Sequence, residues 1–367
     1  MRRPLYIGTG ACGGNMIKVL IVEDSAVIAG HLKGLLESDP EIRILAIAKN
    51  GIEAVAMARN LRPDVITMDI LMPKMDGVKA TRLIMREAPT RIIVVTASAD
   101  RVESRPAFEA IKEGALTVLE KPRGYGHHDY DLIKANLIKT VKVMSTVKVV
   151  TRWGRRSRPT LTSAGFSAEP RIIAIGASTG GPAALSLVLK AFPRLLPVPV
   201  VIVQHMTAGF GSAFAGWLGQ ECALPIKIAE AGELIKPGVV YIAPDDLHLG
   251  VSAGGHVELT TSYAKKTYHR PSINYFFETV ARNYQGHSIG VLLTGMGEDG
   301  ATGLQDIKEA GGKTCCQDEA TSIVFGMPKA AITLGAADIV LPIDKIGPAL
   351  VDTVSAEPAK HGEKVNV

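Results

Sequence analysis

Along the first third of the chain, short apolar runs alternate with longer stretches of helical spacing. The runs are rich in Val, Ile and Leu and predict five strands, at residues 18–24, 43–49, 64–69, 91–97 and 116–122. Stretches such as 26–38 and 51–62 repeat apolar residues every three or four positions and predict intervening helices. This alternation is typical of a parallel sheet with helices on both faces, so we expect a doubly wound α/β domain.

The same pattern returns in the second half of the chain. Apolar runs at 172–176, 198–203 and 288–293 stop at small or polar residues and precede new helical patterns, which predicts a second doubly wound parallel sheet. Between the halves, the periodicity is lost and Ser, Thr, Pro and Arg accumulate, as in a semi-extended linker. The predicted divisions are an extension expected to be disordered (1–15), a first domain (16–144), a linker (145–169), a second domain (170–355) and a tail (356–367).

Composition supports a globular protein. Hydrophobic residues make up 47% and charged residues 21% of the 367 residues, a balance typical of α/β proteins rather than disordered chains. The formal net charge is +5, and the basic segment 152–158 falls in the linker, where such runs are usually solvated. We therefore expect no nucleic-acid partner.

The distribution of cysteines and apolar residues favours the cytoplasm. No C-x-x-C spacing or disulfide framework joins the four cysteines, Cys12, Cys222, Cys315 and Cys316. The uncharged stretch 172–189 is broken at its centre by Gly180-Gly181-Pro182, which argues for a strand and a new helix rather than a membrane span. The first residues lack the apolar length of a signal peptide.

Polar residues follow the strands of the first predicted sheet at the points where the strands end. These residues are Glu23, Asp24, Asp69, Thr96 and Lys121. Ligands of parallel sheets bind at this edge, and three converging carboxylates need a cation to neutralise them, for which Mg²⁺ is suited. Asp69 could then attack a phosphoryl donor, while the Lys121 ammonium and the Thr96 hydroxyl meet the charge of the transferred group.

The Gly-rich segment 176–180 allows two interpretations. It could cradle a dinucleotide phosphate, but no Asp or Glu occurs from 182 to 220 to hold a ribose, and no Walker spacing follows. Alternatively, it presents Ser178 as a nucleophile at a strand end. His205 and Asp299 also follow the ends of apolar strands, and a parallel sheet gathers such ends on one rim, so a Ser-His-Asp triad is favoured.

Two further sequence features bear on this triad. The chain order Ser…His…Asp differs from the Ser…Asp/Glu…His order of the α/β-hydrolases, so the G-x-S-x-G match does not assign that superfamily. Four other histidines lie in loop-like or polar surroundings and are weaker candidates for the base, namely His248, His256, His269 and His287.

The first domain resembles the receiver domain of bacterial response regulators. The resemblance rests on "MDILMPKMDG" around Asp69, on "EKP" at Lys121 and on the acids after the first strand, and it implies a flavodoxin-like fold. It also implies that a chemotaxis-type histidine kinase phosphorylates Asp69 and that Thr96 and Lys121 contact the phosphoryl group. The implied Mg²⁺ ligands are Glu23, Asp24, Asp69 and the carbonyl of Leu71. Val118 departs from the pattern, because such receivers usually carry an aromatic residue there.

The second domain resembles the catalytic domain of the CheB family of chemotaxis protein-glutamate methylesterases. The resemblance rests on "IGASTGGPAAL", "VPVVIVQHM", "LLTGMGEDGATGL" and "QDEATSIVFGMPKAA", with a receiver in front. It implies a Rossmann-like domain in which Ser178 is the nucleophile, His205 the base and Asp299 the orienting acid. The backbone amides of Thr179 and Met296 would form the oxyanion hole, and 269–274 resemble a substrate-side loop.

The resemblance further implies a phosphorylation-activated, cytoplasmic and monomeric enzyme that demethylates, and also deamidates, the cytoplasmic helices of methyl-accepting chemoreceptors. It would contact membrane receptors without inserting into the membrane, and the esterase step itself would need no cofactor. Two alternatives stay open from the residues alone. One is a phosphorylation-controlled binding protein in which the Ser-rich turn is structural, and the other is a different serine hydrolase fused to a receiver.

Overall fold

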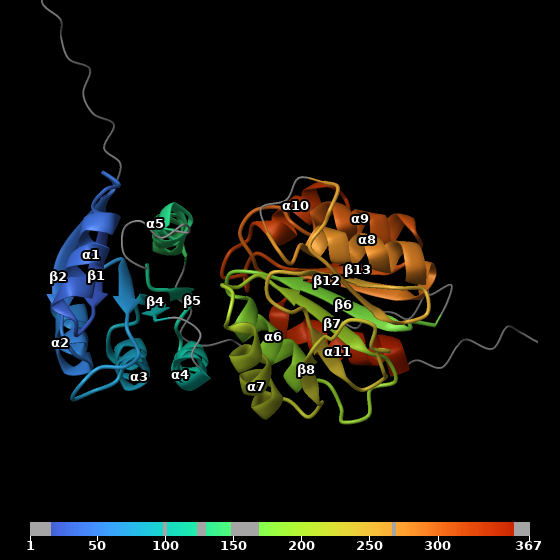
Figure 1. Cartoon of the computed structure of the whole chain (residues 1–367), viewed down its shortest axis with the longest axis horizontal. Helices are drawn as coiled ribbons and strands as arrows, with labels where there is room; N and C mark the ends of the chain where they lie inside the picture. Colours follow the sequence, from blue (N-terminus) through green and yellow to red (C-terminus); the bar gives the residue numbers. More distant parts are fainter. Residues whose placement is uncertain (1–15, 98–100, 123–129, 148–168, 266–268, 356–367) are drawn as a thin grey trace, which may run out of the picture.

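The computed structural model describes residues 16–97, 101–122, 130–147, 169–265 and 269–355 (Figure 1). The predicted extension (1–15), the predicted tail (356–367) and most of the predicted linker (145–169) lie outside the described residues. Among the described residues, no helix is long and apolar enough to cross a membrane.

The first half folds around a five-stranded parallel sheet in the order β2-β1-β3-β4-β5. Helices α1 and α5 cover one face and α2, α3 and α4 the other, around two apolar clusters. The strands are β1 (Ile17–Val22), β2 (Ile42–Ala48), β3 (Val65–Met68), β4 (Arg91–Thr96) and β5 (Thr117–Glu120). The helices are α1 (Ala26–Leu36), α2 (Gly51–Leu61), α3 (Gly77–Glu87), α4 (Arg101–Lys112) and α5 (Tyr130–Thr146).

The second half contains a seven-stranded parallel sheet in the order β14-β13-β12-β6-β7-β9-β8. Its strands are β6 (Ile172–Ala177), β7 (Val200–Gln204), β8 (Ile226–Ile228), β9 (Val240–Ile242), β12 (Ser288–Leu292), β13 (Lys313–Gln317) and β14 (Ile339–Leu341). The strand order reverses at β6, whose neighbours are β12 and β7, and every residue of β6 is buried, as the uncharged run predicts.

Helices cover both faces of this sheet (Figure 1). One layer contains α6 (Gly181–Lys190), α7 (Gly211–Glu221) and α11 (Ile343–Ser355). The other contains α8 (Ile273–Tyr284), α9 (Ala301–Glu309) and α10 (Met327–Thr333), with the short 3₁₀ turn Gln285–His287 after α8. An antiparallel hairpin of β10 (His248–Val251) and β11 (Val257–Thr260) packs on α8, and the sequence pattern did not predict it.

The two halves meet through α4, which packs against α7 and α6. Phe108 of α4 is buried among aromatic rings of the second half and stacks on Trp217 with ring centroids 5.7 Å apart. We call Phe108, Phe210, Phe214 and Trp217 the aromatic cluster. At its edge, Lys112 Nζ pairs with Glu221 Oε1 at 2.7 Å.

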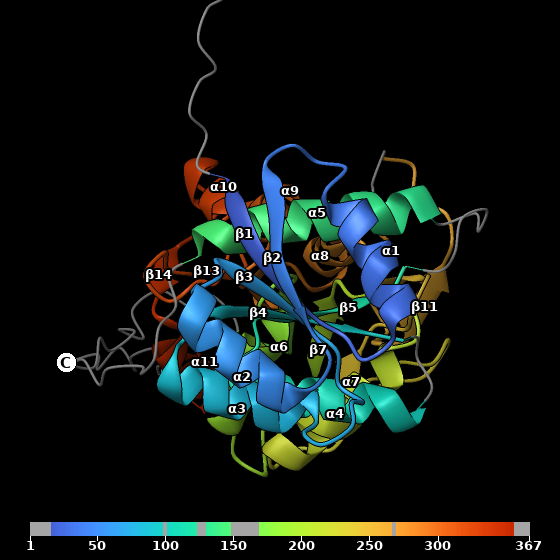
Figure 2. The ribbon, with the colours of Figure 1, turned by 90° about the vertical axis from the view of Figure 1, so that its left-hand side faces the viewer.

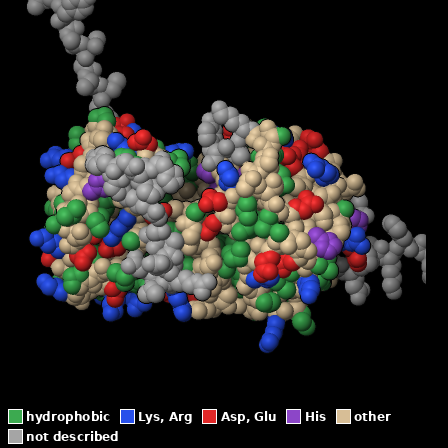
Figure 3. All heavy atoms as spheres, viewed as in Figure 1, with side chains coloured by type: hydrophobic (Ala, Val, Ile, Leu, Met, Phe, Trp, Pro, Cys, Tyr) green, Lys and Arg blue, Asp and Glu red, His purple; other side chains and the backbone are tan. Residues whose placement is uncertain are grey.

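The arrangement of the halves is visible from two directions. In Figure 1, α4, α5 and β5 form the side of the first half that faces the second half, while α1 and α2 lie on the far side. Figure 2 looks onto the first half from that far side, with the second half behind its sheet. On the face shown in Figure 3, acidic and basic side chains are interspersed.

Candidate functional sites

The five polar residues predicted in the first domain lie at the carboxyl edge of its sheet. Glu23 and Asp24 follow β1, Asp69 follows β3, Thr96 ends β4 and Lys121 follows β5. Lys121 Nζ lies 2.9 Å from Glu23 Oε2 and 3.0 Å from Asp69 Oδ2, so one ammonium bridges two acids that come from different strands. The edge thus gathers the predicted residues into one site.

The carboxylates of this site suit a hard divalent cation. Oxygens of Glu23, Asp24 and Asp69 all lie within 4.8 Å of one another. Burial raises the pKa of the Asp69 carboxyl, against the opposing charge and hydrogen bond of Lys121. Burial also raises the pKa of Glu23, so a bound cation would offset the cost of keeping these acids ionised. Participation of the Leu71 carbonyl stays a prediction.

Asp69 and Thr96 have the surroundings that a phosphoryl acceptor site requires. Asp69 is 5% exposed, and its Oδ1 accepts a 2.8 Å hydrogen bond from the Ile70 amide. The Thr96 hydroxyl is buried without a hydrogen-bond partner among the described residues, a condition that a phosphoryl oxygen would relieve. Both features fit the chemistry predicted for the pair.

The three residues of the predicted triad follow three adjacent strands at the switch point of the second sheet. Ser178 follows β6, His205 follows β7, and Asp299 lies in the turn between β12 and α9. Ligands of open parallel sheets bind where the strand order reverses, because the connections leave in opposite directions there and open a crevice.

His205 and Asp299 are directly bonded. His205 Nε2 lies 2.9 Å from Asp299 Oδ2, and both side chains are about nine-tenths buried or more, at 6% and 10% exposed. With the carboxylate accepting at Nε2, that nitrogen carries the hydrogen and Nδ1 keeps its lone pair. Nδ1 is buried with no partner among the described residues, so it is the ring atom able to accept a proton.

The start of α8 holds the Asp299 carboxylate. Oδ2 accepts from the Ile273 amide at 2.8 Å, and Oδ1 accepts from the Asn274 amide at 3.0 Å and from the Ser272 hydroxyl at 3.1 Å. Burial alone would raise the pKa of Asp299, but His205 and these helix amides bring it down to about 2. Asp299 is therefore a fixed anion at neutral pH.

The turn after β6 leaves two amides available beside Ser178. The Ser178 amide itself donates to the Thr294 carbonyl at 3.0 Å, whereas the amides of Thr179 and Met296 have no acceptor among the described residues. A side chain at Gly295 would collide with Ser178 Cβ, which places the backbone leading to Met296 against the nucleophile turn. These two amides are thus available as the predicted oxyanion donors.

A buried threonine ties this turn to the segment 321–326. Thr294 Oγ1 donates toward the Thr179 carbonyl at 3.0 Å and accepts from the Val324 amide at 2.9 Å. Ile323 lies against Gly180 of the nucleophile turn, and both Ile323 and Val324 pack on an apolar cluster of the first domain. The first domain therefore contacts a segment that borders the predicted nucleophile.

Sequence reasoning did not place two other histidines near His205 and Asp299, where the structure puts them. His269 stacks on His205, with ring centroids 4.1 Å apart and planes inclined by 15°. Although His269 is exposed, desolvation by the packed ring of His205 and its surroundings lowers the pKa of His269 to about 4. His248 was expected in loop-like surroundings, but it is buried at the start of β10 and its Nδ1 accepts from the Ser272 amide at 3.1 Å. Nothing in the spacing of the sequence signalled either contact.

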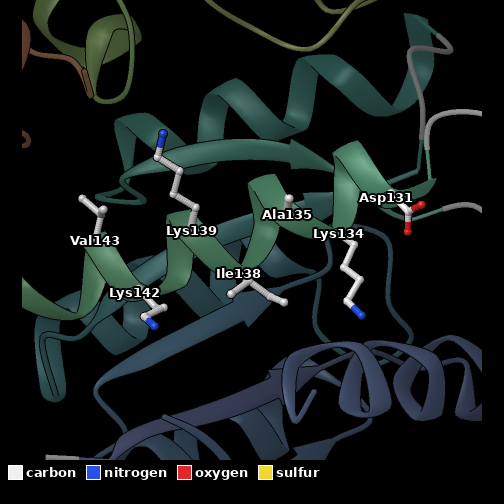
Figure 4. Close-up of a pocket in the computed structure, with 7 residues that line it drawn as sticks. All are labelled: Asp131, Lys134, Ala135, Ile138, Lys139, Lys142 and Val143. Carbon is white, nitrogen blue, oxygen red and sulfur yellow. The ribbon is translucent and has the colours of Figure 1, made fainter. Parts of the chain in front are cut away.

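The charge of the first domain reaches this region through α5. A groove of about 560 Å³ lies along α5, and in Figure 4 Lys134 and Lys142 extend to one side of the helix while Lys139 extends to the opposite side. The positive charge of Lys139 is one of the smaller influences that lower the pKa of His269.

Comparison with known proteins assigns both halves. The family model described as "Response regulator receiver domain" matches residues 19–127, and "CheB methylesterase" matches residues 173–350. A protein-glutamate methylesterase/protein-glutamine glutaminase of Nitrosospira multiformis is 47% identical over 355 residues, which cover 95% of this chain and 99% of that protein. A protein of the same description from Syntrophus aciditrophicus is 45% identical and covers 92% of this chain and 98% of its own length.

Among solved structures, the Thermotoga maritima CheB methylesterase catalytic domain is 42% identical, with a TM-score of 0.48, and covers 50% of this chain and 99% of that chain. The response regulator domain of Thermotoga maritima CheB is 37% identical, with a TM-score of 0.33, and covers 36% of this chain and 98% of that chain. Because relatives align along nearly the whole chain and a family model matches each half, this protein belongs to the CheB methylesterase family with an N-terminal receiver domain and is an enzyme of the ester-hydrolase class.

Proposed function

We propose that this protein hydrolyses γ-glutamyl methyl esters on the cytoplasmic helices of chemoreceptors, with Ser178, His205 and Asp299 as its triad. The observation that carries the proposal is the bonded His205–Asp299 pair beside a buried serine at the switch point of the sheet. The names of its relatives support methyl glutamate as the substrate and glutamine deamidation as a second reaction.

In the proposed mechanism, Ser178 Oγ attacks the ester carbonyl while His205 Nδ1 takes the hydroxyl proton. Asp299 keeps the ring oriented and stabilises the imidazolium that forms. The amides of Thr179 and Met296 donate to the oxyanion, and its collapse expels methanol, which receives the proton from His205. Water then attacks the acyl-enzyme by the reverse proton path and releases the glutamate carboxylate. With a glutamine side chain, ammonia leaves in place of methanol.

We also propose that phosphorylation of Asp69 by a chemotaxis-type histidine kinase activates this esterase in the cytoplasm. Glu23, Asp24 and Asp69 would hold Mg²⁺, which would neutralise the negative charge of the site, and Lys121 and Thr96 would contact the phosphoryl group. The packing of the receiver on Ile323 and Val324, next to the nucleophile turn, supports restraint of the esterase by the unphosphorylated receiver. Phosphorylation would shift the balance away from this docked arrangement.

Ser178→Ala tests the catalytic proposal. The variant should lose methanol release from methylated receptor membranes while it keeps its thermal midpoint and still binds receptor, because only the nucleophilic oxygen is removed. Retained methanol release would contradict the triad. Equal hydrolysis of methylated receptor and of a generic ester by the wild type would favour a different serine hydrolase.

Asp69→Asn tests the regulatory proposal. This substitution removes the phosphoryl acceptor but keeps the size of the side chain, so basal methanol release should continue at the wild-type rate. Addition of a small phosphodonor such as acetyl phosphate should stimulate the wild type and leave the variant unchanged. Stimulation of the variant to the wild-type level would refute activation through Asp69.

A further inference from the structure

Gln204, the last residue of β7, occupies the space between the two turns that present Ser178 and His205. Its side chain is buried, and Nε2 donates to the Ser178 carbonyl at 2.8 Å and to the His205 carbonyl at 2.7 Å. An amide nitrogen carries two hydrogens, so both are used. One side chain thus joins the backbones of the proposed nucleophile and the proposed base.

This link lies just beyond the end of the strand ladder. The pairing of β6 with β7 ends at Ala177 and Gln204, and the His205 amide makes a last bond to the Ala177 carbonyl at 2.9 Å. From there β6 turns into α6, while the chain after β7 enters the loop before α7. The Gln204 amide therefore continues the cross-strand connection by one residue, to the two positions where the reaction would occur.

The orientation of the Gln204 amide is determined by its surroundings. A flipped amide would place Oε1 against two carbonyl oxygens, so Nε2 must face Ser178 and His205. Oε1 then lies beside Gly181, where any Cβ would collide with it, and it has no hydrogen-bond partner among the described residues. A buried amide oxygen without a donor is costly, so this position retains a polar side chain at some expense in stability.

The two hydrogen bonds that Gln204 Nε2 donates offset this cost in stability. The Ser178 carbonyl accepts a second bond from the Gly181 amide at 2.8 Å, which forms the tight turn into α6. The His205 carbonyl is bonded through Gln204 instead of through the ladder. Without the Gln204 amide, the bond from the His205 amide to the Ala177 carbonyl would be the one remaining backbone hydrogen bond, among the described residues, between His205 and the strand that leads into the Ser178 turn.

We propose that Gln204 is a positioning residue that sets the separation between the Ser178 hydroxyl and His205 Nδ1. This inference rests on the proposed triad and adds a residue to which no chemical role has been given. A displacement of about 1 Å between reacting groups can lower a rate about 100-fold. Since Gln204 Nε2 bonds to backbone carbonyls and not to the ring of His205, its loss should lower kcat and leave KM and the midpoint of the pH profile unchanged.

The test uses the full-length protein with three substitutions of Gln204. Gln204→Met removes both N–H donors while keeping a side chain of similar length. Gln204→Glu replaces the amide by a carboxylic acid of the same shape. Gln204→Asn keeps the amide but shortens the side chain by one methylene group. The matched control is Gln305→Met on α9, where the glutamine amide donates to Glu309 of the same helix, at a distance from both sites. Rates are measured well below the lowest thermal midpoint and are expressed per folded molecule.

We expect kcat for receptor demethylation to fall about 10- to 100-fold in all three variants, with KM within about twofold of the wild type. The midpoint of the pH profile of kcat/KM should stay in place while its plateau falls. Phosphonylation of Ser178 by a fluorophosphonate, which forms the Oγ–P bond and releases fluoride, should slow by the same factor, because it needs the same nucleophile and base but no receptor. The Gln305→Met control should match the wild type throughout.

Three outcomes would overturn the proposal: a kcat within twofold of the wild type, a shifted pH midpoint with a retained plateau, or a loss of rate fully explained by the folded fraction. Phosphodonor labelling of Asp69 in each variant checks the receiver separately. Ser178→Ala is assayed in parallel. If it stays active, the proposed triad fails, and if it is inactive while the Gln204 variants keep wild-type rates, only the role of Gln204 fails.

Discussion

Phe108→Ala is expected to raise the basal esterase activity by weakening the contact between the receiver and the catalytic domain. Phe108 is 2% exposed, and its ring contacts Phe210, Phe214 and Trp217 of the catalytic domain. Under the proposed regulation, this contact holds the receiver over Ile323 and Val324. Removal of the ring costs more in the docked arrangement, where the rings of the catalytic domain surround it.

The size of the effect follows from the burial of the ring. Truncation of a fully buried Phe to Ala costs about 3–5 kcal/mol. Because part of the Phe108 ring also packs on its own domain, we assign about 2–3 kcal/mol to docking, which weakens the docking equilibrium about 30- to 150-fold. The polar contacts at the edge are exposed on the lysine side and contribute little, so they cannot replace the ring.

The assay is methanol release from methylated receptor membranes, with and without a phosphodonor. Basal kcat/KM of Phe108→Ala should approach the value that the wild type reaches when phosphorylated, and further stimulation should shrink accordingly. Leu61→Ala, which removes a half-exposed apolar side chain from α2 on the far side of the receiver, is the control and should behave as the wild type. If Phe108→Ala still accepts a phosphoryl group but its basal rate stays within twofold of the wild type, then the contact of α4 does not restrain the esterase.

Two further predictions concern charge near the triad. Asp299→Asn should lower kcat about 10⁴-fold in the methanol assay, because the carboxylate no longer holds the His205 tautomer. The folded-state pKa of Asp299, about 2, lies below the ordinary 3.8. The ionised carboxylate therefore contributes about 2 kcal/mol to the free energy of unfolding above pH 4, and this contribution is lost as the pH falls toward 2. The stability difference between the wild type and Asp299→Asn should shrink in the same way at low pH. For His269, the folded-state pKa of about 4 lies below the ordinary 6.5, so the unfolded chain takes up the proton first and some stability is lost from pH 6.5 to 4. Because the residue is exposed, solvent screening keeps this loss small. Thermal midpoints of His269→Asn should therefore fall less than those of the wild type over this range, and parallel curves would contradict the assignment.

The sequence could group the candidate residues of each site because parallel strands end on one edge of a sheet. Glu23, Asp69 and Lys121 could be grouped from strand ends alone, and the structure places the three side chains in direct contact. The same reasoning grouped His205 with Asp299, which are 94 positions apart in the chain. Strand periodicity is a local sequence signal. Because parallel strands end on the same edge of the sheet, residues at their ends come together even when they are far apart in the chain.

The support of Asp299 could not be predicted in this way. Its carboxylate binds the first amides of α8, and a helix start carries no sequence signal for the anion that it will meet. Residues 269–274 were expected to form a substrate-side loop, but Ser272 caps α8 and Asn274 lies within it. The hairpin that buries His248 was also missed, because its strands are only four residues long and show no clear alternation.

The contact of α4 with the catalytic domain indicates how a change at Asp69 would reach the esterase. Thr96 ends the strand before α4, and Lys121 follows the strand after it, so both residues that would meet the phosphoryl group flank this helix in the chain. Val118 packs on the apolar cluster that contains Phe108, so a small residue there still connects β5 with α4. Couplings between sites are typically about 1–3 kcal/mol, comparable to the docking free energy assigned to the Phe108 ring. Under the proposed regulation, phosphorylation would need to weaken docking by no more than the loss of one aromatic contact does, and this would shift the balance away from the docked arrangement.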